Sequence, residues 1–285
     1  IGTTFLQVAG NPIMRDVSPQ GAYGRNLSFA QGFKGIGSTV SSYLVTAIAG
    51  FALFESMGWR GVFPIFFILM AVTFVWVATL KIEETKADVP PSILTSLQLL
   101  QKPVFAMAVL GIFLYVGAEV CMGRFLLPLL EAMGLEKSTA SKFGPAFFFM
   151  MLTVGRLAGG AVLTLLTPRT FFRLSAALGL LGAGLLMLGN PSFAILGVLA
   201  AGLGFANIWP MLFSITVEEE PQRSSELSGL MCMAISGGAL VPLAMSKLVD
   251  SGLAAKAFII PVICFFYLLA LSLKGPSKVK PAAAQ

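Results

Sequence analysis

The chain has 285 residues, of which 56% are hydrophobic and only 11% are charged, and its mean hydropathy is +0.87. Soluble proteins contain about 25% charged residues, so this composition excludes a soluble globular domain and indicates an integral membrane protein. The net charge of +6 does not indicate a nucleic-acid partner, because the basic residues occur singly in short loops rather than along one stripe.

Apolar runs long enough to cross a bilayer recur along the chain, and we expect an all-α membrane fold. A hydrocarbon core of about 30 Å requires about 20 helical residues. Eight full spans are predicted, at 28–60, 61–80, 103–130, 141–166, 171–189, 192–217, 225–248 and 255–273. Residues 1–14 are apolar too, but at about 1.5 Å per residue they would cover only about 21 Å. We interpret them as the end of a ninth span.

One long polar connector divides the chain. Residues 81–102 contain mixed charges and the pair Pro90 and Pro91, which is typical of a linker. Three spans precede this linker and six follow it, and the sequence begins without Met. We therefore expect a fragment of a transporter with two six-helix halves. The predicted parts are the end of an N-terminal helix bundle (1–80), a linker (81–102), a C-terminal six-helix bundle (103–274) and a tail (275–285).

The positions of the 19 Lys and Arg residues predict the orientation in the membrane, because cytoplasmic loops are richer in these residues. One set of alternate loops contains Arg15, Arg25, Lys81, Lys86, Lys102, Arg169, Arg173, Arg223, Lys274, Lys278 and Lys280. The other set contains only Arg60, Lys137, Lys142, Lys247 and Lys256. We therefore expect the linker and the C-terminal tail to be cytoplasmic.

The first full span contains a lysine that needs an explanation. Placing Lys34 in hydrocarbon would cost about 2.5–3.5 kcal/mol even on lenient insertion scales. Gln31 precedes it by three positions and faces the same side of a helix, and we expect Gln7 of the preceding, antiparallel helix to lie at a similar depth. A site that binds substrate is one explanation. Snorkelling of the lysine to the interface is the other.

Glu119 is the only acidic residue deep within a predicted span. It lies about 24 Å along the helix from Pro103, near mid-depth. Carboxylates in membranes are usually functional, so we expect coupling or substrate binding, although a structural ion pair with Arg124 or Lys34 is an alternative. Arg124 is five residues further on, about 140° around the helix, which makes it a poor partner on the same face.

Two other spans contain unusual polar residues. Asn207 and Trp209 precede Pro210, which removes a backbone hydrogen bond and frees a carbonyl at mid-depth. Broken helices at this depth mark binding sites in transporters, so we expect Trp209 either to stack on a sugar or to serve in packing. Arg156 lies beside small residues that favour close helix packing. We interpret it as structural, paired with a carboxylate such as Glu218.

Neither an enzyme nor a metalloprotein is predicted. The chain contains no histidine, and Cys121, Cys232 and Cys264 lie singly in apolar runs without metal-ligand spacing. No combination of nucleophile, base and orienting residue is visible. We therefore expect neither catalysis nor a cofactor, and any proton transfer would use carboxylates or lysine.

Five segments of the sequence form a recognisable combination, namely TTFLQVAGNP, NLSFAQGFKGIGS, YVGAEVCMGRFL, VGRLAGG and GFANIWPMLFSI. Together they resemble the fucose and glucose/galactose permease family of the major facilitator superfamily. The resemblance covers nearly the whole chain. It implies a major facilitator fold, with this chain corresponding to roughly helices 4 to 12 of 12.

The resemblance also implies roles for individual residues. Gln7, before the ANP-like residues that include Asn11, matches a sugar-contacting position of the fourth helix. Fucose permeases have a carboxylate there, so Gln7 points to the glucose/galactose side of the family. Lys34 stands where fucose members have Asn, which is a departure from the family pattern. Glu119 matches a Glu or Gln of the seventh helix, and Trp209 an aromatic residue of the tenth that lines the cavity. A first-helix Asp implicated in proton coupling would lie outside this sequence.

These observations predict a secondary active monosaccharide transporter of the bacterial inner membrane, monomeric and coupled to protons. The alternatives are a sodium-coupled or uncoupled carrier, a sugar-acid transporter, and a transporter-like sensor that binds its ligand without moving it. The expected partners are the sugar, the proton or sodium ion, and the lipid bilayer. The residues expected at the substrate site are Gln7, Asn11, Gln31, Lys34, Glu119, Asn207 and Trp209, with Glu119, Lys34 and Arg124 as candidates for coupling or ion pairing.

Overall fold

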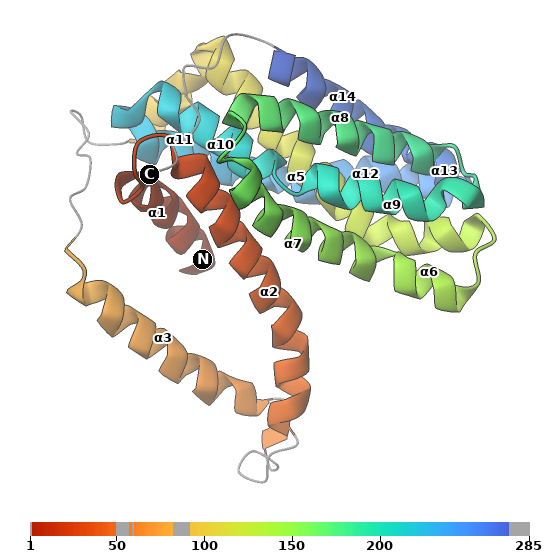
Figure 1. The fold of residues 1–285 in the computed structure, drawn as a ribbon, viewed down its shortest axis with the longest axis horizontal. Coiled ribbons are helices and arrows are strands. Elements are labelled where there is room, and N and C mark those ends of the chain that lie inside the picture. Colours follow the sequence, from red (N-terminus) through yellow and green to blue (C-terminus); the bar gives the residue numbers. More distant parts are fainter. Residues whose placement is uncertain (1, 50–56, 59, 82–91, 274–285) are drawn as a thin grey trace. The chain divides into compact units, whose positions relative to one another are not determined.

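The computed structural model describes residues 2–49, 57–58, 60–81 and 92–273, and every regular element within these residues is a helix (Figure 1). The chain divides into two compact units. One consists of residues 1–32 and 85–285, and the other of residues 33–84. Helix α2 (Tyr23–Ala49) crosses this division. The predicted domain boundaries near residues 80, 102 and 274 stay a prediction.

The smaller unit contains the later part of α2 and helix α3 (Val62–Thr79). Large apolar side chains on α3 are exposed along its length, including Phe67, Phe74 and Trp76. Exposed apolar side chains on a helix of this length suit contact with lipid, since a span needs about 20 apolar residues.

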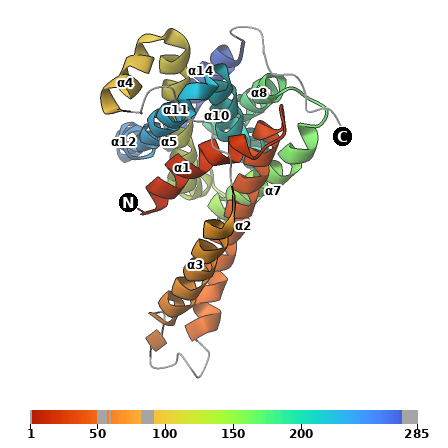
Figure 2. The ribbon, with the colours of Figure 1, turned by 90° about the vertical axis from the view of Figure 1, so that its left-hand side faces the viewer.

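The larger unit is a bundle built mostly from the region after the predicted linker. Its helices are α1 (Gly2–Asp16), the first part of α2, α4 (Ile93–Gln98), η2 (Leu99–Gln101), α5 (Pro103–Ala132), α6 (Lys137–Phe143), α7 (Pro145–Val162), α8 (Pro168–Met187), α9 (Pro191–Phe205), α10 (Ile208–Glu219), η3 (Pro221–Arg223), α11 (Ser224–Met233), η4 (Ala234–Ser236), α12 (Gly237–Asp250), α13 (Ala254–Ala257) and α14 (Ile259–Leu273). Figure 1 shows α8 beside α9, and Figures 1 and 2 show α1 beside α11.

Proline marks the start of the long helices α5, α7, α8 and α9. Proline suits the first helical position because the N–H that it lacks would have no partner there. Two of these helices also have side-chain caps. The Thr167 side chain accepts a hydrogen bond from the Thr170 backbone N–H, and Asn190 accepts one from Ser192.

Seven candidate membrane spans occur in the described residues, and they correspond to the second to eighth spans predicted from the sequence. The first predicted span, 28–60, is not among them. Most of its described part belongs to α2, which begins at Tyr23 and includes the polar residues Arg25, Gln31 and Lys34. Residues 50–56 and 59 of that predicted span lie outside the described residues.

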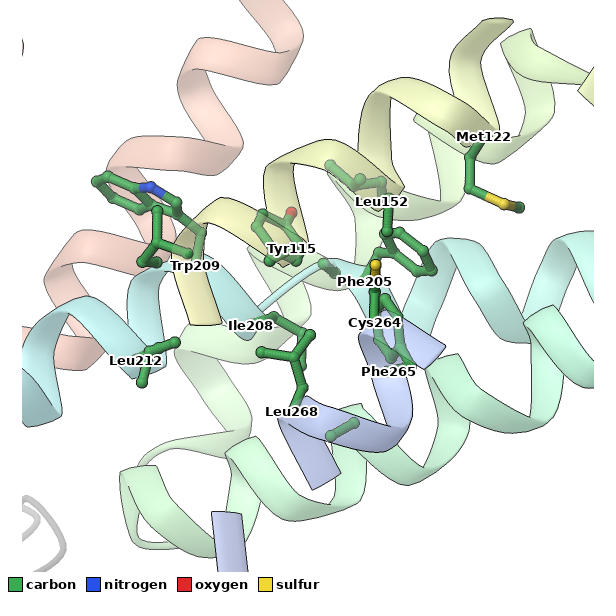
Figure 3. Close-up of a cluster of buried hydrophobic side chains, with 14 of the residues drawn as sticks. Tyr115, Met122, Leu152, Phe205, Ile208, Trp209, Leu212, Cys264, Phe265 and Leu268 are labelled. Atoms are coloured by element: carbon green, nitrogen blue, oxygen red, sulfur yellow. The ribbon is translucent and has the colours of Figure 1, made fainter. Parts of the chain in front are cut away.

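Aromatic side chains form the centre of the larger unit (Figure 3). Phe205 lies against Phe265, with ring centroids 4.1 Å apart, and against Phe148 at 5.3 Å. All three are fully buried. Gly179 permits this packing, because a Cβ there would overlap the ring of Phe265. The cluster therefore holds the C-terminal end of α9 in a defined place, just before that helix is interrupted.

Segments on either side of the predicted linker are also joined within this unit. The Ser228 hydroxyl of α11 donates to the Val8 carbonyl of α1 at 2.9 Å. Arg223 donates to the Thr95 carbonyl of α4 at 2.7 Å and pairs with Glu226. Residues 92–101, which were predicted to be part of a linker, thus include a short helix tied to the start of α11.

Candidate functional site

Glu119 lies on α5 and forms an ion pair with Arg156 of α7. The distance from its Oε2 to Nη2 of Arg156 is 3.6 Å, and the two side chains are 22% and 11% exposed. Two opposite charges in an apolar interior stabilise each other mainly by avoiding an unpaired buried charge. The predicted pairing of Arg156 with Glu218 is therefore wrong. For Glu119 the sequence suggested Arg124 or Lys34 as a partner, and the structure shows a pair with Arg156.

Arg156 has two further partners, which hold its guanidinium in place. Its Nε donates to the Ala206 carbonyl at 3.1 Å, and its Nη2 lies 3.4 Å from the hydroxyl of buried Tyr115. A guanidinium has five donors in a rigid planar fork. One side chain can therefore bind a carbonyl, a hydroxyl and a carboxylate from three directions.

The Ala206 carbonyl is available because Pro210 follows it by four residues. In a continuous helix that carbonyl would accept from the N–H of residue 210, but proline has none. Helix α9 ends at Phe205 and α10 begins at Ile208, with Asn207 in a non-helical conformation. The predicted helix break with a freed carbonyl therefore lies at this position, and Arg156 is the group that binds the carbonyl.

Asn207 forms a hydrogen bond in the opposite direction, from the break to α7. Its Nδ2 donates to the Gly155 carbonyl of α7 at 2.7 Å, and the side chain is almost completely buried. Gly155 and Gly159 make room for the break. A Cβ at residue 155 would lie 2.6 Å from the Ala206 Cβ, and one at residue 159 would overlap the Asn207 amide. Gly155 and Gly159 of α7 thus leave room for the non-helical residues between α9 and α10.

Trp209 follows the break and lies at one end of the buried cluster in Figure 3. It is 7% exposed, and its ring stacks on Phe213 with centroids 4.8 Å apart. One face of the indole is therefore covered by the protein. The packing role of Trp209 is seen in this contact with Phe213. Stacking of a sugar on the other face of the indole stays a prediction.

Three other predicted site residues lie on different helices from this ion pair. Gln7 and Asn11 are on α1 and Gln31 is on the first part of α2, and none of them forms a hydrogen bond with Glu119 or Arg156 in the described part of the chain. Asn11 is buried, its carbonyl accepts from the Tyr23 hydroxyl at 3.0 Å, and its Nδ2 has no protein partner.

Two other predicted basic residues, Lys34 and Arg124, are exposed. Lys34 belongs to the smaller unit, where it is exposed on α2. Its proposed pairing with Glu119 stays a prediction. Arg124 is exposed, and its guanidinium lies 5.5 Å from the ring centroid of Phe125. The role of Arg124 in coupling or ion pairing stays a prediction.

Tyr115 and Ala206 are site residues that sequence reasoning did not identify. Two signals pointed to them. Tyr115 precedes Glu119 by four positions, so both lie on one face of α5. Ala206 precedes Pro210 by four positions, which identifies its carbonyl as the one without a helical donor.

Comparisons with known proteins agree with this architecture. The sequence profile described as Major Facilitator Superfamily matches residues 1–243. The chain is 29% identical over 284 residues to a glucose/galactose transporter of Brucella abortus biovar 1 (strain 9-941), covering 96% of this chain and 69% of that protein. It is 23% identical over 301 residues to the L-fucose-proton symporter of Haemophilus influenzae (strain ATCC 51907 / DSM 11121 / KW20 / Rd), covering 93% and 70%.

Solved structures are similar in fold. The crystal structure of FucP, a Major Facilitator Superfamily transporter in the outward conformation, matches with a TM-score of 0.78 at 18% identity, covering 94% of this chain and 72% of that one. A variant of the E. coli fucose:proton symporter FucP matches with a TM-score of 0.74, also at 18% identity, with the same coverage. The helical fold with seven candidate spans, the break in one of them and the profile match over most of the chain lead to one conclusion: the chain belongs to the Major Facilitator Superfamily.

Proposed function

We propose that this protein is a sugar permease that moves a monosaccharide together with a proton by alternating access. The observation that carries the proposal is the Glu119–Arg156 pair, a carboxylate and a guanidinium joined in the apolar interior of a Major Facilitator Superfamily chain. Ionisable groups inside a membrane protein usually serve transport or proton transfer. The similarity to a glucose/galactose transporter and to an L-fucose-proton symporter supports a sugar as substrate.

The ion pair supplies a physical basis for coupling. When Glu119 takes up a proton, Arg156 loses the negative charge that faces it, and an unpaired cation in an apolar interior is unfavourable. A sugar whose hydroxyl oxygens accept from Arg156 would offset part of that cost. Proton and sugar would then favour each other's binding, and this reciprocity is what symport requires.

A neutral sugar fits the Glu119–Arg156 pair better than a sugar acid, because the pair has no net charge. Gln7, Asn11, Gln31 and Asn207 would supply amide donors and acceptors to the hydroxyls. The Oδ1 of Asn207 and the Nδ2 of Asn11 are both buried and have no hydrogen-bond partner in the protein. Lys34 would add donors for hydroxyls, or bind the carboxylate if the cargo is a sugar acid. Trp209 would stack on the sugar through the indole face opposite Phe213.

The bacterial relatives support a placement in the inner membrane. The loop charges support an orientation with the linker and the C-terminus in the cytoplasm. We also propose that the protein acts as a monomer. Attaching a thiol-reactive, membrane-impermeant label to a cysteine introduced at Ser277 tests the orientation. Labelling of intact cells at that position would contradict it.

The test is uptake of radiolabelled D-glucose, D-galactose and L-fucose by the intact protein in proteoliposomes. We expect accumulation under an inward proton gradient and no accumulation without one. Glu119→Gln should retain sugar exchange but lose accumulation. Glu131→Gln is the matched control, because Glu131 is an exposed carboxylate on the same helix.

Each alternative predicts a different result. Accumulation driven only by a sodium gradient indicates sodium coupling, and equilibration without accumulation indicates an uncoupled carrier. Uptake restricted to D-galacturonate indicates a sugar-acid transporter. Binding without uptake under every gradient indicates a sensor. Normal proton-driven accumulation by Glu119→Gln would contradict the coupling role of that carboxylate.

A further inference from the structure

The break between α9 and α10 and the ion pair at Glu119 share one side chain. Arg156 binds the Ala206 carbonyl through Nε and faces Glu119 through Nη2. A guanidinium is rigid and planar, so these two contacts are not independent. A shift of the arginine toward a new partner would stretch or release its bond to the break.

A purely structural cap for the Ala206 carbonyl would not need a charge. A hydroxyl or a water molecule satisfies a single freed carbonyl as well, and neither requires burial of a guanidinium. The side chain of Arg156 is 11% exposed, and that of its counter-charge, Glu119, is 22% exposed. A ligand or proton would therefore reach Glu119 more readily than Arg156, and the arginine would respond to the change at Glu119.

The break is also joined to helices beyond α7. On its far side, α10 packs against the start of α2, where a Cβ at Gly24 would lie 3.0 Å from the Ser214 Oγ and 3.3 Å from the Met211 Cε. On its near side, Phe205 is fixed in the aromatic cluster. Since Phe205 anchors the end of α9, we expect a change at Ala206 and Asn207 to be passed along α10 to the start of α2.

We infer that Pro210 and Asn207 are positioning residues of the transport cycle: the carbonyl freed by Pro210 holds Arg156 against Glu119, and loading of Glu119 loosens this bond and lets α10 move. The inference has two parts. Its transport half, the release of α10 when Glu119 is loaded, rests on the proposed function. Its structural half, that Pro210 and Arg156 act through the Ala206 carbonyl, does not depend on that function.

The structural half is tested by thermal unfolding of the intact protein in detergent without ligand. Arg156→Lys keeps a positive charge but has one nitrogen in place of the fork. It should lower the Tm by several degrees in the parent protein. Pro210→Ala restores the N–H that the Ala206 carbonyl lacks, so in that background Arg156→Lys should lower the Tm by less than half as much. Equal losses in both backgrounds would overturn the inference.

The transport half is tested by separating sugar binding from turnover. We expect Pro210→Ala to keep the half-saturating D-galactose concentration within threefold and to reduce the maximal rate of proton-driven uptake at least tenfold. Pro242→Ala is the control, since Pro242 is another buried proline within a helix, α12, and should change both quantities less than twofold. In the double variant, Pro210→Ala with Arg156→Lys, uptake should be no slower than in the worse single variant.

The outcomes are distinguishable. If the parent protein accumulates no sugar under any gradient, the proposed function fails, and the unfolding experiment still decides whether the two residues share a carbonyl. If the parent accumulates sugar and Pro210→Ala transports at the parental rate, the positioning role is wrong. If the rate losses of the two single variants multiply in the double variant, the residues act independently and the inference is also wrong.

Asn207→Asp, which lacks the Nδ2 donor to Gly155, should reproduce the loss of rate, whereas Asn190→Asp at the start of α9 should not.

Discussion

Two ion pairs in the larger unit differ in a way that distance alone does not predict. Lys102 and Glu220 approach to 2.8 Å, but their side chains are 53% and 28% exposed. Arg156 and Glu119 are 3.6 Å apart and only 11% and 22% exposed. In water, a close pair gains little because solvent screens the charges and the side chains lose rotational freedom. In an apolar interior, loss of one partner leaves a buried charge without compensation, which destabilises the protein. Burial, not separation, decides which pair matters.

The largest expected effect follows from breaking the buried pair on one side only. Arg156→Met leaves Glu119 without its counter-charge and the Ala206 carbonyl without a donor. We expect a loss of about 3–5 kcal/mol in the free energy of unfolding. Adding Glu119→Gln should recover most of it, because the unpaired charge is removed. Denaturant titration monitored by tryptophan fluorescence measures both. A double variant as unstable as Arg156→Met alone would show that the ion pair is not the source of the loss.

A smaller effect is expected from disturbing the packing that places the buried pair. Gly159→Ala puts a methyl group into the space of the Asn207 amide. Overpacking of this kind costs about 1–3 kcal/mol, and we expect slower sugar uptake because the break is displaced from Arg156. Gly184→Ala is the matched control, since nothing lies near its Cβ and alanine favours a helix. Thermal unfolding of both variants decides the point. Equal stability of the two variants would argue against the close fit.

The smallest effect is expected at the exposed pair. Lys102→Ala should change the free energy of unfolding by about 0.2–1 kcal/mol after solvent screening is taken into account. The effect should shrink further at 1 M salt, where the Debye length is about 3 Å. Sugar uptake should stay at the parental rate. A loss as large as that of Arg156→Met would contradict the comparison, because the exposed pair would then contribute as much as the buried one.

Much of the fold was predictable because bilayers and backbones impose local rules. Seven of the eight predicted spans correspond to candidate membrane helices, since each must supply about 20 apolar residues whatever its neighbours are. The α2 region differs, because polar residues such as Arg25, Gln31 and Lys34 interrupt its apolar character. The break near Pro210 was predictable for a similar reason: proline lacks an N–H in every context.

The candidate site was predictable in its parts but not in its connections. The sequence by itself determined that Glu119 is a deep carboxylate, that Arg156 lies between closely packing glycines and that a carbonyl is free before Pro210. Only the tertiary structure decided that Arg156 pairs with Glu119 rather than Glu218, and that the same arginine binds the freed carbonyl. Periodicity relates residues within one helix, whereas the partner of a side chain on another helix depends on which surfaces pack. Here the packing depends on Gly155 and Gly159, because a side chain at either position would overlap Ala206 or Asn207.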